Sequence, residues 1–132
     1  SNQTPLHLAA ENGCDSTVEI LLKTGVEKDP RDYWKKTPLH LAAENGCDST
    51  VEILLKSGVE KDPGDDWNRT PLHYAAKNGC DSTVEILLKT GVEKDPRDYL
   101  YRTPLHLAAE NRRDSTVGIL MKAGVEKDPR DE

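Results

Sequence analysis

The 132-residue sequence lacks the features that define several broad classes of protein. Its apolar runs, such as residues 20–22, are far shorter than the roughly 18 residues that a membrane-spanning helix needs, and its first residues form no signal-peptide pattern. Basic residues are outnumbered, at 18 Lys and Arg against 24 Asp and Glu, and they do not cluster into a field that attracts a nucleic-acid backbone. We therefore expect neither a membrane nor a nucleic acid as a partner.

Cysteine is scarce, and the three copies are Cys14, Cys47 and Cys80, each 33 residues from the next. Helices in neighbouring stacked units lie about 8–10 Å apart, beyond the roughly 7 Å limit between the Cα atoms of a disulfide. We expect free thiols. An odd set of unpaired thiols favours an intracellular location over a secreted one.

The most informative feature is an internal repeat. Thr-Pro-Leu-His begins at residues 4, 37, 70 and 103, a constant spacing of 33 residues. Periods of 20–50 residues indicate stacked repeats rather than a single globular core. We therefore predict one domain over residues 1–132, built from four units at approximately 4–36, 37–69, 70–102 and 103–132.

Each unit begins with the pattern of a short helix. Thr can cap a helix with its hydroxyl group, and Pro at the first helical position loses an amide that has no partner there. In the second unit Leu39, Ala42 and Ala43 fall at positions i, i+3 and i+4, which gives a narrow apolar stripe of small residues. Gly46 predicts the end of this helix, because glycine adopts positive φ without strain.

A second helix is predicted within each unit. Ser49 and Glu52 have the spacing of a capping box, and an apolar face follows at Val51, Leu54 and Leu55. Residues 59–69 contain Pro and Gly, which predict a loop or hairpin leading to the next unit.

The unit resembles the ankyrin repeat, which has a 33-residue period and a T-P-L-H-x-A pattern. Residues 37–43, Gly46 and the Leu54-Leu55 pair stand where that family has them, and the resemblance covers essentially all 132 residues. It implies an all-α solenoid of four stacked helix-turn-helix pairs with short β-hairpin or loop connections. It also implies a concave face, formed by hairpin tips and first helices, that binds other proteins.

Some positions depart from the family pattern. Lys35, Asn68 and Tyr101 stand where the family has a turn glycine, so we expect distorted turns. The fourth unit has Arg112 in place of Gly, and Gly118 in place of Glu within its second helix. Each change costs on the order of 1 kcal/mol, and we expect the last helix pair to fray first.

No pattern in the chain favours catalysis or metal binding. One His occupies the same position in each unit, at residues 7, 40, 73 and 106, whereas zinc needs its ligands within about 2.3 Å of one point. We predict that these side chains bond to Thr and backbone groups instead. The Asp-rich loops lack the twelve-residue calcium motif and are predicted turns. We expect no enzyme, no catalytic residues, no metal and no cofactor.

The units differ mainly in their hairpins, where five of the six aromatic residues lie. Stacking requires the same residues in every unit, whereas a partner does not, so we place the binding residues at the variable positions. Tyr, Trp and Arg also dominate interface hot spots. The predicted partner-binding residues are Tyr33, Trp34, Lys36, Glu44, Asp66, Trp67, Arg69, Tyr74, Lys77, Tyr99, Leu100, Tyr101, Arg102 and Glu110.

Other interpretations of the same pattern remain open. The aromatic residues could brace neighbouring hairpins instead of binding a partner. Because the first unit is nearly identical to the second, its outer face should be apolar, which allows head-to-tail self-association or an excerpt of a longer array that acts as a spacer. The near-identical copies also allow an engineered scaffold without a specific ligand.

Overall fold

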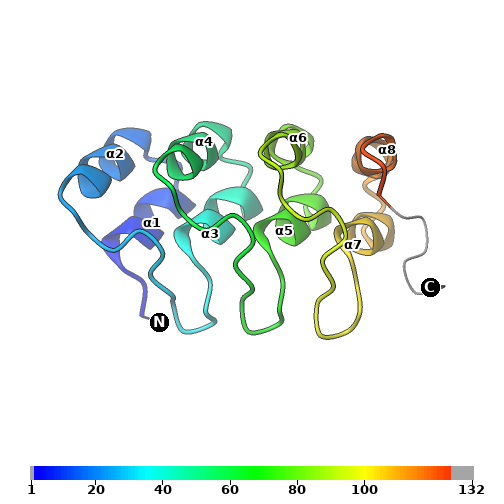
Figure 1. The fold of residues 1–132 in the computed structure, drawn as a ribbon, viewed down its shortest axis with the longest axis horizontal. Helices are drawn as coiled ribbons and strands as arrows, with labels where there is room; N and C mark the ends of the chain where they lie inside the picture. The colour runs from blue at the N-terminus through cyan, green and yellow to red at the C-terminus, as the bar shows by residue number, and fades with distance from the viewer. Residues whose placement is uncertain (1, 126–132) are drawn as a thin grey trace.

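The computed structural model describes residues 2–125, and this range contains eight α-helices in four antiparallel pairs (Figure 1). The helices are α1 (Pro5–Glu11), α2 (Asp15–Lys23), α3 (Pro38–Glu44), α4 (Asp48–Lys56), α5 (Pro71–Lys77), α6 (Asp81–Lys89), α7 (Pro104–Glu110) and α8 (Asp114–Lys122). The first helices of the pairs form one row and the second helices form another, and the connecting loops project beyond the first row. This arrangement confirms the all-α solenoid. Within residues 2–125 the connections are loops with tight turns rather than β-strands.

The first helix of every pair begins as the Thr-Pro pattern predicts. The Thr37 hydroxyl accepts a hydrogen bond from the backbone N–H of His40 at 3.3 Å, and Thr37 N donates to His40 Nδ1 at 3.0 Å. Nε2 therefore carries the ring proton, which it donates at 2.7 Å to the carbonyl of Arg69, the last residue before the next Thr-Pro pair. The predicted structural role of the histidines is confirmed. Burial lowers the pKa of His40 to about 4, so the ring is neutral at pH 7.

The start of the second helix corrects one prediction. The helix begins at Asp48, but its N-cap residue, Cys47, makes no side-chain cap, and Ser49 and Glu52 do not form a capping box. Ser49 is already inside the helix, and its hydroxyl donates to the carboxylate of Asp15 in the preceding repeat. The side chain that suggested a local cap therefore joins two repeats.

The same polar contact joins all three pairs of neighbouring repeats. The Asp15 carboxylate also accepts a hydrogen bond from the Thr50 hydroxyl at 2.5 Å, and the hydrogen bonds from Ser49 and Thr50 lower its pKa. The equivalent Asp residues of the second and third repeats accept from the Ser-Thr pairs at 82–83 and 115–116. Each carboxylate thus fixes the register between consecutive second helices.

The apolar core runs without a break through the four pairs, from Leu6 to Leu120. Leu39, Ala42 and Ala43 are almost completely buried, which confirms the predicted stripe on the first helix. Its small alanines let neighbouring first helices approach closely. No helix within residues 2–125 is long and apolar enough to cross a membrane.

Three loops share one turn despite their different residues. Lys35, Asn68 and Tyr101 all adopt the left-handed conformation, with φ of 63°, 59° and 62°. The different residues therefore do not give different turns, and the three turns share their hydrogen bonds: the buried Asp32 carboxylate accepts from the backbone N–H groups of Trp34 and Lys36 at 2.9 and 2.8 Å. The Asp residues at 65 and 98 accept equivalent bonds.

Candidate functional site

The loop tips carry a row of large exposed side chains, which we call the tip row. Its members leave between 51% and 69% of their surface exposed and are Tyr33, Trp34, Trp67, Tyr99, Leu100 and Tyr101. Asp66, also predicted to bind, is exposed beside Trp67. Exposed apolar groups scattered singly are ordinary, whereas these six lie on adjoining loop tips.

The backbone holds adjacent tips at a fixed spacing. Asp66 N donates to Trp34 O at 2.9 Å, and Tyr99 N donates to Trp67 O at 2.9 Å, so each tip is joined to the next. The rings of Tyr33 and Trp34 meet edge to face at 5.1 Å within one tip. Among the described residues no ring pair joins two tips. The tips are therefore joined to one another by backbone hydrogen bonds.

Between the tips and the ends of the first helices lies a charged row, which comprises Lys36, Glu44, Arg69, Lys77, Arg102 and Glu110. Lys36, which directly precedes the second repeat, pairs through Nζ with Glu44 Oε1 at 3.1 Å. Arg102, which directly precedes the fourth repeat, pairs through Nη1 with Glu110 Oε1 at 2.7 Å. Both pairs link the residue before Thr-Pro to the last residue of the first helix.

The third repeat breaks this pattern because Lys77 replaces the acidic residue at the end of α5. Arg69 turns instead to Asp98 in the next repeat, with 3.0 Å between Nε and Oδ2. Burial opposes the ionisation of Asp98, but hydrogen bonds from Arg102 and Arg69 outweigh it and lower the pKa. This pair was not predicted from the sequence, although the loss of the acidic residue at position 77 was the signal that Arg69 needs another partner.

Lys77 itself pairs with no acidic side chain in the part of the chain that the structure describes. Its helix lies between α3 and α7, which end in Glu44 and Glu110. Both glutamates are already paired with the basic residue that precedes their repeat. Among the described residues, the charged row therefore has one cation without an acidic partner, near its middle.

Tyr74 was predicted to contact a partner, but the structure places it beneath the surface with 4% exposure. Its hydroxyl donates to the carboxylate of Asp65, and Lys36 Nζ lies 4.4 Å from the centre of its ring. Burial raises the pKa of the phenol far above its usual value, so the hydroxyl stays protonated and remains a donor. Tyr74 thus supports the charged row from below and fixes the turn through Asp65.

The remaining polar groups offer little chemistry. Within residues 2–125 no three His, Cys, Asp or Glu side chains gather as metal ligands would. All three cysteines are free, and burial raises the pKa values of Cys47 and Cys80, which keeps these thiols protonated.

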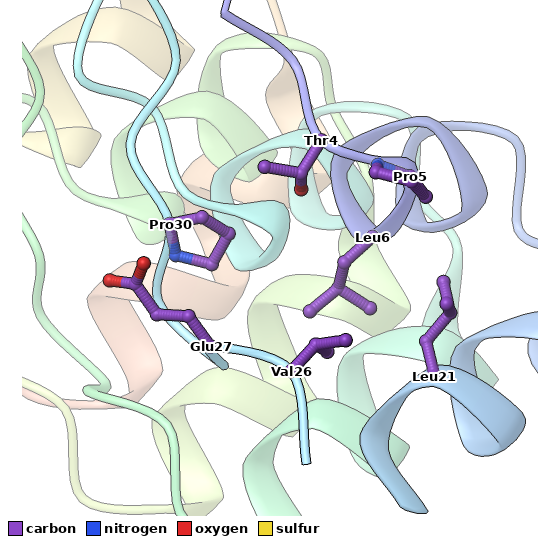
Figure 2. Close-up of a pocket in the computed structure, with 7 residues that line it drawn as sticks. All are labelled: Thr4, Pro5, Leu6, Leu21, Val26, Glu27 and Pro30. Atoms are coloured by element: carbon purple, nitrogen blue, oxygen red, sulfur yellow. The ribbon is translucent and has the colours of Figure 1, made fainter. Parts of the chain in front are cut away.

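A groove of about 240 Å³ lies on the outer face of the first repeat, and Figure 2 shows Leu6, Leu21 and Val26 converging on it. The lining is apolar apart from Thr4 and Glu27.

Comparison with protein families identifies the repeat. A family model described as ankyrin repeats (three copies) matches residues 1–65 and again residues 58–131. Together the two matches cover nearly the whole chain, and they agree with the helix pairs of the structure. No curated protein is significantly similar to the chain.

Proposed function

The chain belongs to the ankyrin-repeat family, and we propose that residues 1–132 act as one protein-binding module that uses the tip row and the charged row. Ankyrin repeats are generally protein-interaction modules, so the family supports this class of function. The observation that carries the proposal for this chain is the exposure of six large apolar side chains along adjoining tips. These residues differ between repeats, whereas the buried core residues are nearly all the same, Tyr74 in place of Leu being an exception.

The tip row has the properties of a binding hot spot. Aromatic side chains bury a large area with few rotatable bonds, and the backbone bonds between tips remove most of the cost of ordering them. The tip row can therefore bind a partner without a rearrangement of its loops. Non-catalytic function and an intracellular location are part of the same proposal, the latter because the three thiols are unpaired.

The charged row sets which partner fits. Lys77 is the one cation of the row without an acidic partner among the described residues, so we expect the partner to place a carboxylate there. A partner with an apolar segment for the tips and an acidic group for Lys77 matches both rows. Lys77→Glu restores the acidic residue of the other repeats and should reduce the association rate most at low salt.

The test is affinity capture from a cell lysate with two matched triple variants. One replaces the tip residues Trp34, Trp67 and Tyr99 by Ala. The control replaces Glu19, Glu52 and Glu85, which are exposed on the second helices, by Ala. We expect the tip variant to lose proteins that the wild type and the control both retain. If all three chains captured the same set of proteins, this result would refute binding through the tips and would favour a spacer or a scaffold without a ligand.

A second candidate function is end-to-end association of chains. The outer face of the first repeat favours it, because Leu8 and Val26 are exposed there while their equivalents in the inner repeats are buried. The two functions use different surfaces, so they can be tested separately.

A further inference from the structure

Two positively charged departures from the repeat pattern lie together at the contact between the third and fourth repeats. Lys77 stands where the other repeats have Glu, and Arg113 stands where they have Cys. Helix α5 ends at Lys77 and α7 ends shortly before Arg113, and these two helices are neighbours in the stack (Figure 1). The Nε atom of Arg113 donates a hydrogen bond to the carbonyl oxygen of Lys77 at 3.1 Å. We call these two residues the basic pair.

The aliphatic part of the Arg113 side chain is held in place. Its Cδ lies 2.8 Å from the position that a Cβ atom on Gly79 would occupy, so the side chain packs directly against this glycine. At the two preceding junctions the smaller side chain of a cysteine occupies the equivalent place. Arg113 is exposed, and no residue in the range 2–125 accepts a hydrogen bond from its Nη atoms. Its guanidinium group is therefore positioned by the fold and retains its Nη donors for a ligand.

The basic pair reverses the charge of this junction. At the first two junctions the corresponding residues are a glutamate and a cysteine, at positions 11 and 47 and at positions 44 and 80. Lys77 and Arg113 bring two positive charges instead, in a chain with a net charge of -6. Neither forms an ion pair with a carboxylate of the described residues, and this includes Asp114, which follows Arg113. The pair is therefore a local excess of positive charge on an acidic protein.

We propose that the basic pair binds two neighbouring carboxylates of an acidic segment in the partner protein. Arg113 holds one carboxylate through two parallel N–H···O bonds, and Lys77 pairs with the other. This inference rests on the protein-binding function proposed above; it adds Arg113 to the binding surface and a second acidic group to the partner. Charge complementarity favours an acidic protein segment, whereas a chain with a net charge of -6 repels a long polyanion such as a nucleic acid.

One partner can contact both the basic pair and the tip row. The basic pair lies at the end of α5, and the tips lie beyond the starts of the first helices. Because α5 has seven residues, it is only roughly 10 Å long. Tyr74, another departure from the repeat pattern, lies on the same helix. The residues that distinguish this chain's repeats thus concentrate around α5, where the basic pair selects between partners by charge.

NMR titration of the isotope-labelled chain at low ionic strength tests the inference, with hexaglutamate as the probe and hexaglutamine as its uncharged control. We expect hexaglutamate at millimolar concentration to shift the backbone amide signals of residues 77–79 and 112–114, and hexaglutamine to leave them unchanged. Added salt should reverse the shifts, because it screens exposed charges. The absence of these shifts, or larger shifts elsewhere in the chain, would overturn the inference.

A third probe separates carboxylates from phosphate. N-acetyl phosphoserine amide presents a dianion that Arg and Lys side chains also bind. We expect hexaglutamate to bind the basic pair more tightly, because two separate carboxylates engage both cations at once. If phosphoserine binds more tightly, the site is one for phosphate and the assignment to carboxylates is wrong.

Two matched variants assign the contact to Arg113. Arg113→Cys restores the residue of the other repeats, and Lys89→Gln removes one positive charge from an exposed position on α6. We expect Arg113→Cys to weaken the binding of hexaglutamate by about tenfold, and Lys89→Gln to weaken it only slightly. Circular dichroism checks that both variants fold. Equal losses of affinity would overturn the inference, because the attraction would then come from the overall charge of the chain.

Failure of this inference is distinguishable from failure of the proposed function. Hexaglutamate has no apolar side chain for the tip row, so the triple tip variant should bind it as the wild type does. If hexaglutamate does not bind while the tip variant still loses captured proteins, the basic pair is not a site and the tip row remains one. If hexaglutamate binds while the captured proteins do not depend on the tips, the basic pair stands and binding through the tips fails.

Discussion

At the scale of single residues, the turns of the loops carry strain. Lys35 and Tyr101 adopt positive φ, a conformation that their Cβ atoms disfavour by roughly 1–2 kcal/mol. The buried Asp of each turn compensates by bonding two backbone N–H groups. Backbone strain of this kind is common at binding sites, where the surrounding structure stabilises a φ/ψ combination that the residue otherwise disfavours.

Lys35→Gly should therefore stabilise the fold by about 1 kcal/mol, because glycine adopts positive φ without a Cβ penalty. The substitution also removes the ion pair between Lys35 Nζ and Asp66 Oδ1, which are 3.9 Å apart. Because both side chains are exposed, the loss of this pair offsets little of the gain. Urea unfolding followed by circular dichroism measures the change. Lys35→Ala is the matched control, since it also removes the charge but keeps Cβ; an equal gain from Ala would contradict strain as the cause.

The buried histidines predict a loss of stability in mild acid. Burial lowers the pKa of His40 to about 4 in the folded state, while the unfolded chain binds a proton near pH 6.5. Between these values the unfolded state holds more protons, so the free energy of unfolding falls as the pH falls. His73 shifts in the same direction, also through burial.

From pH 7 to pH 5 we expect His40 alone to lower the free energy of unfolding by about 2 kcal/mol. Urea titrations at the two pH values measure this difference. In the variant His40→Gln the dependence on pH should be smaller, because one titrating group is gone. An identical urea midpoint at pH 7 and pH 5 would show that the rings are accessible to protons in the folded state.

At the scale of elements, we expect α8 to be less stable than the inner second helices, α4 and α6. Val117 on α8 is only half-buried, whereas its equivalents Val18, Val51 and Val84 are fully buried, because no repeat covers α8 within residues 2–125. We predict that the amides of α8 exchange with solvent faster than those of α4. Hydrogen exchange followed by mass spectrometry measures this, and equal protection of the two helices would contradict it.

Gly118 adds to this weakness because it lies inside α8 where no tertiary contact requires glycine. Gly118→Ala should raise the free energy of unfolding by roughly 0.5–1 kcal/mol, through the smaller backbone entropy of the unfolded chain. Gly124→Ala is the contrasting variant, since Gly124 has φ of 88° and alanine is strained there. If both substitutions shifted the melting temperature in the same direction, the result would contradict this explanation.

At the scale of the whole molecule, the free energy of unfolding is approximately the sum of one contribution from each repeat and one from each contact between neighbouring repeats. The effect of a substitution therefore depends on its place in the stack. Asp48→Asn removes the charge that accepts hydrogen bonds from Ser82 and Thr83, and should cost roughly 1.5–3 kcal/mol. Asp114→Asn makes the same chemical change at the uncovered end. In dilute protein it should leave the urea midpoint unchanged, and a similar loss from both variants would contradict the repeated-junction view.

The sequence predicted those parts of the fold that depend on neighbours along the chain. The Thr-Pro start, the capping His and the terminal glycine act within a few residues of one another, and the 33-residue period reveals that the local unit recurs. The aromatic tips could also be found from sequence, because they lie where the units differ. The structure shows these side chains exposed, which supports the predicted surface without testing its partner.

Contacts between residues about 30 positions apart were beyond such reasoning. Ser49 has the spacing of a local cap, yet its hydroxyl bonds Asp15, 34 residues away. Tyr74 was assigned to the surface, but its ring is buried beside the preceding turn, where its hydroxyl bonds Asp65. Local hydrogen bonds and backbone preference decide where a helix begins and ends; only the stacking of repeats decides which side chains are covered, which charges pair and which faces remain open.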